Sequence, residues 1–235
     1  MDFDDFRRHF SAPRVDRYLT AAGNSTSKAV ELYKANLRLY QSFHPLLSVV
    51  EVVLQNRIND TLTIHFKDPD WIINQKGGFM VDPSLTYFHQ STGRSVTNDF
   101  LRKEVEKAEK RLRKMSNTVT SGKVIAEQTF GFWTDLFEVY HYKLLRGRPI
   151  QAFTTLPAHH GRKEVSQELN KIRLFRNRIN HNEPVCFSGR RIDLTNASDV
   201  HKSIGKILTW IDPALLDLVV DLDEVERSIS LVASI

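Results

Sequence analysis

The spacing of apolar residues predicts that this chain is built from helices. Apolar positions recur at intervals of three and four residues along most of the sequence, whereas the alternating runs typical of strands are scarce. Turn-forming residues delimit two short helices that end near Gly23, a helix from about residue 24 to Tyr40, and another from Pro45 to about Phe66. Pro45 is expected at the first position of its helix, where its missing N–H is harmless. The expected fold class is all-α.

The rest of the chain divides in the same way. The interval from Lys67 to Arg94 is rich in proline and glycine and is expected to be a long irregular loop, anchored by the apolar run that begins at Trp71. Thr97 is expected to cap a charged helix that ends near Met115. Further helices are expected at residues 124–145 and 161–181, followed by one or two amphipathic helices after residue 188 that are interrupted at Pro213.

One charged residue occupies an apolar position in the helix expected at residues 161–181. At 100° per residue, Leu169, Ile172 and Ile179 fall within about 40° of Val165 and define the buried stripe. Arg176 falls at about 20°, in the middle of that stripe. A buried arginine without a partner costs several kcal/mol, so Arg176 needs a counter-charge or a water-filled cleft.

Glu51 shows the same anomaly in the helix expected to begin at Pro45. It falls among the apolar residues of one side, which are Leu47, Leu54, Ile58 and Leu62. Glu51 and Arg176 can therefore be each other's partner. Two interpretations stay open: a buried ion pair that only sets the helix register, or a pair at the edge of a polar cleft that is used for function.

A histidine and a proline mark the end of the helix that carries Arg176. Pro184 makes helical geometry unfavourable at Glu183, so His181 is expected in or just beyond the last turn, from where it can turn toward Arg176. Asn177, one turn earlier, could orient the imidazole. The alternative is that His181 is a benign residue at the negative end of the helix dipole.

Composition limits the class of protein. With 41% hydrophobic and 26% charged residues, the chain is expected to be a soluble globular protein. The single cysteine, Cys186, excludes an intramolecular disulfide and a cysteine-based zinc site. The acidic N-terminus does not have the order of a signal peptide, and no apolar stretch approaches eighteen residues. We therefore expect a cytoplasmic protein without a membrane span.

Positive charge is concentrated around the same helix. The net charge is +5, and between Lys143 and Arg178 nine basic residues face only two acidic ones. Clustered Lys and Arg bind polyanions by releasing counterions from phosphates, which favours RNA or DNA as a partner. The alternative is an ordinary solvated face.

Three stretches together resemble one family. They are residues 43–58 (FHPLLSVVEVVLQNRI), 125–137 (IAEQTFGFWTDLF) and 172–185 (IRLFRNRINHNEPV). In order and spacing they are similar to conserved segments of the Abi-like (abortive infection) proteins of the HEPN superfamily. Gln55 stands where that family usually has Arg, and Asn182 where it often has a second His.

The resemblance implies a single HEPN domain over residues 1–235. Its core would cover about residues 28–187, with N-terminal helices at 1–24 and a C-terminal helical extension at 188–235. Members of the superfamily are commonly dimers in which two motif copies face each other across one cleft. Many are metal-independent endoribonucleases without a cofactor, so RNA is the expected partner, and a defence or toxin-like role implies an antitoxin or another regulatory protein.

The resemblance also implies roles for individual residues. His181 would be the general acid or base and Arg176 the ligand of the phosphate and the transition state. Asn177 would orient the phosphate or His181, and Glu51 would hold Arg176 in place, with Asn180 and Glu183 as further supporting residues. The candidate RNA contacts are the neighbouring basic residues Lys171, Arg173 and Arg178.

Competing interpretations belong to other classes of function. The main alternative is a non-catalytic HEPN module that binds RNA, a nucleotide or a partner protein, and another is a purely structural dimerisation unit. A metal enzyme is disfavoured because His159 and His160 lack helical i,i+4 spacing and a nearby carboxylate set. The aromatic residues at 130, 132 and 133 are expected to pack in the core rather than to stack on bases.

Overall fold

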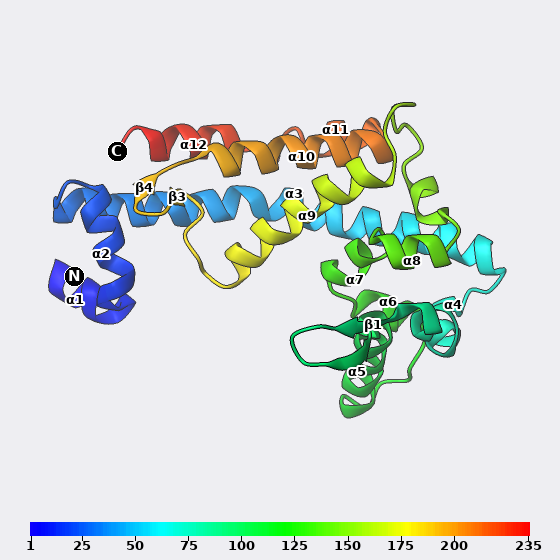
Figure 1. The fold of residues 1–235 in the computed structure, drawn as a ribbon. Coiled ribbons are helices and arrows are strands. Elements are labelled where there is room, and N and C mark those ends of the chain that lie inside the picture. The colour runs from blue at the N-terminus through cyan, green and yellow to red at the C-terminus, as the bar shows by residue number, and fades with distance from the viewer. The chain divides into compact units, whose positions relative to one another are not determined.

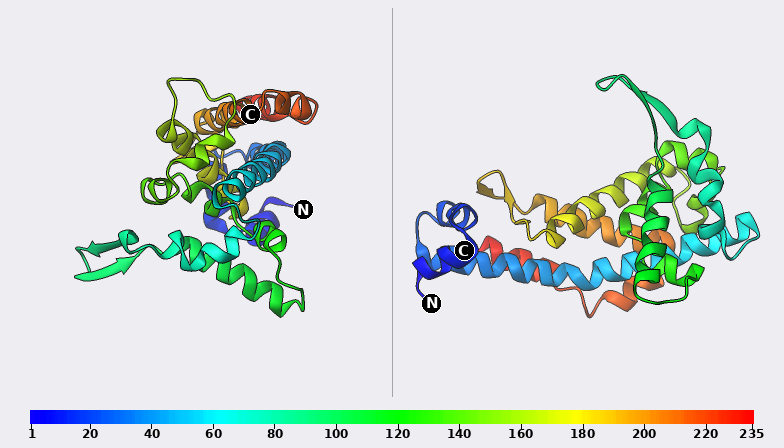
Figure 2. Two further views of the ribbon diagram at one scale, coloured as in Figure 1. Left: turned by 90° about the vertical axis from the view of Figure 1, so that its right-hand side faces the viewer. Right: turned by 90° about the horizontal axis from the view of Figure 1, so that it is seen from below.

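Helices make up most of the structure, as the apolar spacing predicts. The computed structural model describes residues 1–235, of which 69% are helical and 5% lie in strands (Figures 1 and 2). The expected all-α class is confirmed. The helices are α1 (Phe3–Phe10), α2 (Ala12–Ala21), α3 (Thr26–Phe66), α4 (Trp71–Asn74), α5 (Phe100–Lys114), α6 (Ser121–Ala126), α7 (Phe130–Asp135), α8 (Val139–Leu144), α9 (Arg162–Asn180), α10 (Thr195–Ile211), α11 (Ala214–Val219) and α12 (Val225–Ala233).

Short 3-10 turns and two small hairpins connect these helices. The 3-10 turns are η1 (Gln75–Gly77), η2 (Phe79–Val81), η3 (Pro83–Leu85) and η4 (Arg148–Ala152). The antiparallel strand pairs are β1 (Thr86–His89) with β2 (Arg94–Thr97), and β3 (Phe187–Ser188) with β4 (Arg191–Ile192).

The chain forms two compact units. The first consists of Met1–Val50, Leu174–Thr209 and Pro213–Ile235, and the second of Glu51–Arg173 with Trp210–Asp212. The helices α3 and α9 each contribute residues to both units. The single HEPN domain with a core at 28–187 stays a prediction.

An aromatic cluster joins the N-terminal helices to α3 in the first unit. The ring of Tyr33 on α3 lies 5.2 Å from that of Phe6 on α1, 5.0 Å from Phe10 and 5.1 Å from Tyr18 on α2. Aromatic pairs at these distances add to the stabilisation from burial. The N-terminal helices are therefore packed elements of this unit.

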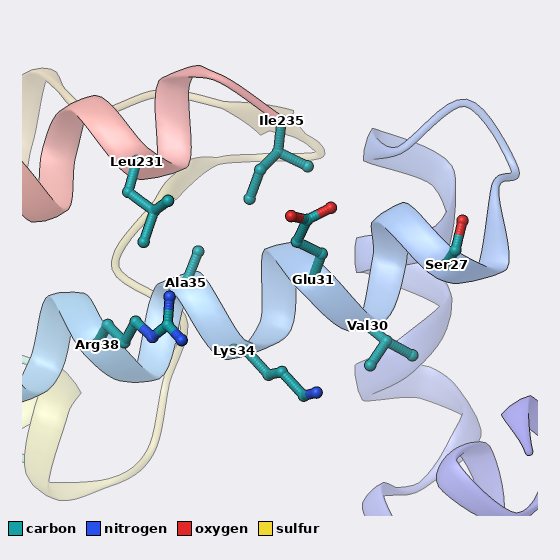
Figure 3. Close-up of a pocket in the computed structure, with 8 residues that line it drawn as sticks. All are labelled: Ser27, Val30, Glu31, Lys34, Ala35, Arg38, Leu231 and Ile235. Atoms are coloured by element: carbon teal, nitrogen blue, oxygen red, sulfur yellow. The ribbon is translucent and has the colours of Figure 1, made fainter. Parts of the chain in front are cut away.

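The C-terminal helix α12 runs beside the first half of α3 (Figure 1). Leu231 of α12 faces Ala35 of α3 across a pocket of about 350 Å³ (Figure 3). Nearby, the Lys28 ammonium donates a hydrogen bond of 3.0 Å to the backbone oxygen of Ile235. This side of α3 is thus covered by the C-terminal part of the chain.

The core of the second unit forms around Trp71, the expected anchor. Trp71 is fully buried, and its indole N–H donates to the side-chain oxygen of Asn59 at 3.0 Å. Phe130, Phe132 and Trp133 of α7 are at most 2% exposed. Their expected role in core packing is confirmed.

The expected helix boundary at Pro45 is wrong. The structure has one continuous helix, α3, of 41 residues with Pro45 in its interior. Proline has no N–H to bond the carbonyl of Gln41, which usually breaks a helix. Here Phe43, Leu46 and Leu47 on either side of the proline are buried, and this packing holds the helix together.

The interval after α3 is more ordered than expected. Instead of a loop from 67 to 94, the chain forms α4, three 3-10 turns and the β1–β2 hairpin, in which Thr86 pairs with Thr97. Thr97 therefore ends a strand, and Asp99 precedes α5 in the capping position. Seven of the eight strand residues are exposed, so the apolar alternation that would reveal a strand is absent. Figure 2 shows this hairpin extending beyond the helices of its unit.

The helix expected at residues 124–145 is also divided. It forms three short helices, α6, α7 and α8, with turns between them. Apolar residues occur on all sides in this segment, so their spacing did not reveal the turns.

Replacing Pro45 with alanine tests whether packing alone keeps α3 continuous. An interior proline costs a helix about 3 kcal/mol, and the lower entropy of proline in the unfolded chain returns up to about 1 kcal/mol of this. Pro45→Ala is therefore expected to raise the free energy of unfolding by about 2 kcal/mol in urea denaturation. A decrease in this value would show that the packing around residue 45 requires the proline.

Candidate functional site

Arg176 lies on the buried side of α9, as the helical spacing predicts. Val165 and Leu169 are fully buried and Ile172 is 1% exposed, which confirms the apolar stripe. Arg176 and Ile179 continue this stripe and are half-buried. Arg176 is thus partly removed from water. Its electrostatic interactions are stronger there than at the exposed surface, because the dielectric constant is lower.

The helix ends just before His181 in a well-defined turn. The N–H of Asn182 bonds to the carbonyl of Ile179 at 2.9 Å, and the N–H of Glu183 to that of Arg178 at 2.8 Å. Asn182 has a φ of 55°, in the left-handed region. These two bonds and this conformation form the Schellman motif that commonly ends helices, with asparagine in place of glycine.

This turn leaves His181 as the last residue whose N–H bonds to the carbonyl four residues earlier, as in an α-helix. Its N–H still donates to the carbonyl of Asn177 at 2.9 Å, and its side chain is exposed. The expected position in or just beyond the last turn is confirmed. Because the backbone of His181 still follows α9, its side chain starts about 140° around the axis from that of Arg176.

Two side chains of α3 hold the segment that follows the turn. The Tyr40 hydroxyl donates to the carbonyl of Glu183 at 2.6 Å, and the side-chain oxygen of Asn36 accepts from the N–H of Val185 at 3.1 Å. Val185 and Cys186 are at most 1% exposed.

Burial raises the pKa of the Tyr40 hydroxyl to about 12 and that of the Cys186 thiol to about 12. Both groups are therefore neutral at physiological pH.

Arg178 and Glu183 are engaged within the turn itself. The guanidinium of Arg178 donates to the carbonyl of Pro184, and its Nε lies 3.9 Å from Oε2 of Glu183. Arg178 is half-buried, whereas the Glu183 side chain is 60% exposed. Arg178, a predicted RNA contact, thus also stabilises the end of the helix.

A second arginine holds the hairpin after this segment. The guanidinium of Arg17 on α2 lies over the ring of Phe187, 4.6 Å from its centroid, and donates to the carbonyl of Gly189. The backbone that follows His181 is therefore fixed both by α3 and by α2.

The other predicted RNA contacts, Lys171 and Arg173, belong to the second unit. The Lys171 ammonium lies 3.2 Å from both carboxylate oxygens of Glu168, and two N–H groups of Arg173 donate to the side-chain oxygen of Asn170 at 3.1 and 3.0 Å. Lys171 keeps half of its side chain exposed, whereas Arg173 is half-buried.

The predicted site residues are only partly brought together. Six of them lie in the first unit on one continuous segment: Arg176, Asn177, Arg178, Asn180, His181 and Glu183. Glu51 lies in the second unit. Both Glu51 and Arg176 are half-buried and have interaction partners. Their pairing with each other stays a prediction.

Asn36 and Tyr40 are structural residues of this site that the sequence reasoning missed. Asn36 is only 1% exposed and lies one turn after Leu32, which is fully buried. A polar residue on an apolar stripe was the signal that singled out Glu51 and Arg176. The same signal applied to residues 32–43 would have found Asn36.

Two further properties bear on the chemistry. Among residues 1–235, no group of three or more His, Cys, Asp or Glu side chains is arranged to hold a metal ion. No helix is both long and apolar enough to cross a membrane. Independence of metals and cofactors stays a prediction.

Comparison with known proteins leaves the family open. The chain matches no protein-family model, no curated protein sequence and no solved structure. The resemblance to Abi-like HEPN proteins therefore stays a prediction.

The left-handed conformation of Asn182 gives a stability test. For a non-glycine residue without a short polar side chain, the left-handed conformation costs about 1 kcal/mol or more of folding free energy. Asn182→Ala is expected to lower the free energy of unfolding by about 1 kcal/mol, whereas Asn182→Gly leaves it nearly unchanged. Asn180→Ala, at the exposed last residue of α9, is the matched control. Equal stabilities for the alanine and glycine variants at 182 would contradict this account of the turn.

The buried Cys186 thiol gives a test by pH. Its pKa rises from an ordinary value of 9.0 to about 12 in the folded protein, so the unfolded chain releases this proton first as the pH increases. Its contribution to stability is therefore present below pH 9 and lost between about pH 9 and 12, at up to about 1.4 kcal/mol per pH unit.

Urea denaturation at pH 8, 9 and 10 measures this loss. Cys186→Ala is expected to be less stable at pH 8 but to lose less stability than the parent chain between pH 9 and 10. Parallel decreases in the two chains would show that the thiol titrates normally. A thiol reagent at pH 8 should label the parent slowly in buffer and rapidly in urea, because the thiolate is the reactive form.

Proposed function

We propose that this protein is a metal-independent endoribonuclease, an Abi-like member of the HEPN superfamily with an abortive-infection or toxin-like role. One observation carries the proposal. A half-buried arginine, Arg176, and an exposed histidine, His181, end the same helix, and the backbone after His181 is held by Tyr40 and Asn36. This helix end therefore supplies a positive charge and a titratable group on diverging sides of α9.

Two of the tasks in RNA cleavage suit these two side chains. The nucleophile is the 2′-hydroxyl of the substrate, which attacks the adjacent phosphorus, forms a new P–O bond and displaces the 5′-oxygen of the next nucleotide. His181 is suited to accept the 2′-hydroxyl proton because imidazole titrates near neutral pH. Arg176 is suited to stabilise the crowded phosphorane, because a planar guanidinium binds two phosphate oxygens.

A dimer would complete the proton balance. The leaving 5′-oxygen needs a proton, which His181 of the partner subunit, in its protonated form, can supply. The products are then a 2′,3′-cyclic phosphate and a free 5′-hydroxyl. On one helix the side chains of Arg176 and His181 start about 140° apart, so they do not face the same phosphate. In a dimer, the His181 side chain of one subunit can face the Arg176 side chain of the other, which favours this arrangement. Asn177, half-buried one turn before His181, would orient the phosphate or the imidazole.

The other candidate residues fit an RNA partner to different degrees. Lys171 is the most accessible of the predicted contacts and would bind phosphate as a point charge. Glu183 would repel phosphate if it were unpaired, so it contributes through its contact with Arg178. Asn180 is exposed beside His181 and can donate a hydrogen bond to RNA.

A non-catalytic RNA-binding module is the second candidate. Two observations favour it: the excess of basic residues between Lys143 and Arg178 suits a polyanion, and Arg178 and Glu183 are engaged in the helix-ending turn. These motif residues therefore have a structural reason to be present, independent of any reaction.

Cleavage of a fluorescent RNA in EDTA separates the two candidates. The parent chain is expected to produce 2′,3′-cyclic phosphate ends, whereas His181→Ala should lose at least about a hundredfold in rate, the usual contribution of a general acid or base. Arg176→Lys keeps the charge but not the planar geometry and should also lose most activity. Circular dichroism establishes that each variant is folded.

Lys163→Ala is the control for this experiment, because Lys163 is an exposed basic residue at the other end of α9. It should retain activity. RNA binding without product ends at any protein concentration would support the second candidate. Unchanged cleavage by His181→Ala would exclude the proposed role of the histidine.

A further inference from the structure

A pocket with aromatic walls opens beside the end of α9. It has a volume of about 230 Å³ and lies entirely within the first unit. Its walls come from Phe10, Tyr18, Tyr33 and Tyr40, which belong to the first three helices. Arg14 and Asn182 add polar groups to the lining.

The aromatic walls are held rigidly. Tyr33 is 7% exposed and contacts the rings of both Phe10 and Tyr18 at about 5 Å. Phe10 is 37% exposed, so part of its ring is accessible. Burial raises the pKa of the Tyr18 and Tyr40 hydroxyls, so both walls stay uncharged at neutral pH. Tyr18 is only 1% exposed and Tyr33 7%, so these two rings form the floor of the pocket, and the more open rings of Phe10 and Tyr40 offer the faces on which a single-stranded base can stack.

The polar groups suit the remaining parts of a nucleotide. Arg14 is exposed and can contact a phosphate or stack on a base. The Asn182 side chain is also exposed, and its amide can both donate to and accept from a base edge. The Tyr40 hydroxyl already donates to the carbonyl of Glu183, so Tyr40 offers its ring rather than its proton.

Position links this pocket to the proposed reaction. Asn182 directly follows His181, and consecutive Cα atoms are about 3.8 Å apart. The pocket beside α12 in Figure 3 contrasts with it, because that pocket is lined by Glu31 together with Lys34 and Arg38 and has no aromatic wall. Of these two pockets, only the one near His181 combines stacking surfaces with polar groups.

We infer that the aromatic pocket binds one unpaired base of the RNA, next to the phosphate on which His181 acts. This inference rests on the proposed ribonuclease function for its biological meaning, although base binding is measurable without cleavage. The N-terminal helices, which supply Phe10, Arg14 and Tyr18, would then form part of the substrate site.

Single-stranded RNA oligomers with 2-aminopurine at one position test this inference. Binding is measured with the His181→Ala chain, so that the RNA stays intact. At one labelled position, stacking in the pocket is expected to quench the fluorescence. The same oligomer without that base should bind about tenfold more weakly, because stacking on an aromatic side chain contributes an effect of this size.

Two variants change the pocket without removing its buried walls. Leu37 is a 43% exposed residue of the lining, and Leu37→Glu should place a negative, non-aromatic side chain in the space, abolish the quenching and weaken binding about tenfold. Arg14→Ala should weaken binding several-fold and lower the salt dependence by about one phosphate contact. Arg8→Ala is the matched control, because Arg8 is 74% exposed on α1 and does not line the pocket; it should change neither value.

The outcomes separate this inference from the proposed function. Quenching that is lost in Leu37→Glu and kept in Arg8→Ala supports the pocket, even if the parent chain cleaves no RNA. Cleavage by the parent chain with no quenching at any position would overturn the base pocket and leave the ribonuclease intact. Equal binding of the oligomers with and without the base would also overturn it.

Discussion

Two hydrogen bonds from α3 determine where the backbone runs after α9. Tyr40 holds the carbonyl of Glu183, and Asn36 holds the N–H of Val185. The next residue, Cys186, is fully buried, so the segment is fixed on one side by polar contacts and on the other by apolar packing. Because Asn36 and Tyr40 are one turn apart on the same helix, the contacts reinforce each other. The course of the chain after His181 depends on this attachment.

The motif residues divide into those that build the helix end and those left for chemistry. Arg178 and Glu183 contact the turn, and Asn182 provides its left-handed residue. Arg176 and His181 remain as a half-buried cation and an exposed imidazole on the same helix end. A motif that is partly structural can therefore persist without activity, which is why catalysis and RNA binding have to be measured separately.

The N-terminal helices connect the aromatic core with this helix end. Tyr33 packs between Phe10 and Tyr18, and Arg17 reaches the hairpin that follows the motif. A disturbance of α1 or α2 would therefore affect the candidate site through packing, without contact with either Arg176 or His181. The pocket between these helices and Asn182 follows from the same arrangement.

Local patterns in the sequence determined the helical class, the extent of α9 and the anomaly at Arg176, because helical periodicity depends on residues three and four apart. They also located the end of α9, since Pro184 restricts the residue before it. The continuous α3, the β1–β2 hairpin and the roles of Asn36 and Tyr40 were decided by tertiary structure. Asn36 and Tyr40 act through hydrogen bonds that span more than a hundred residues. The continuous α3 depends on burial that outweighs the missing bond at Pro45, and the hairpin on strand pairing without an apolar face, and helical periodicity reveals neither.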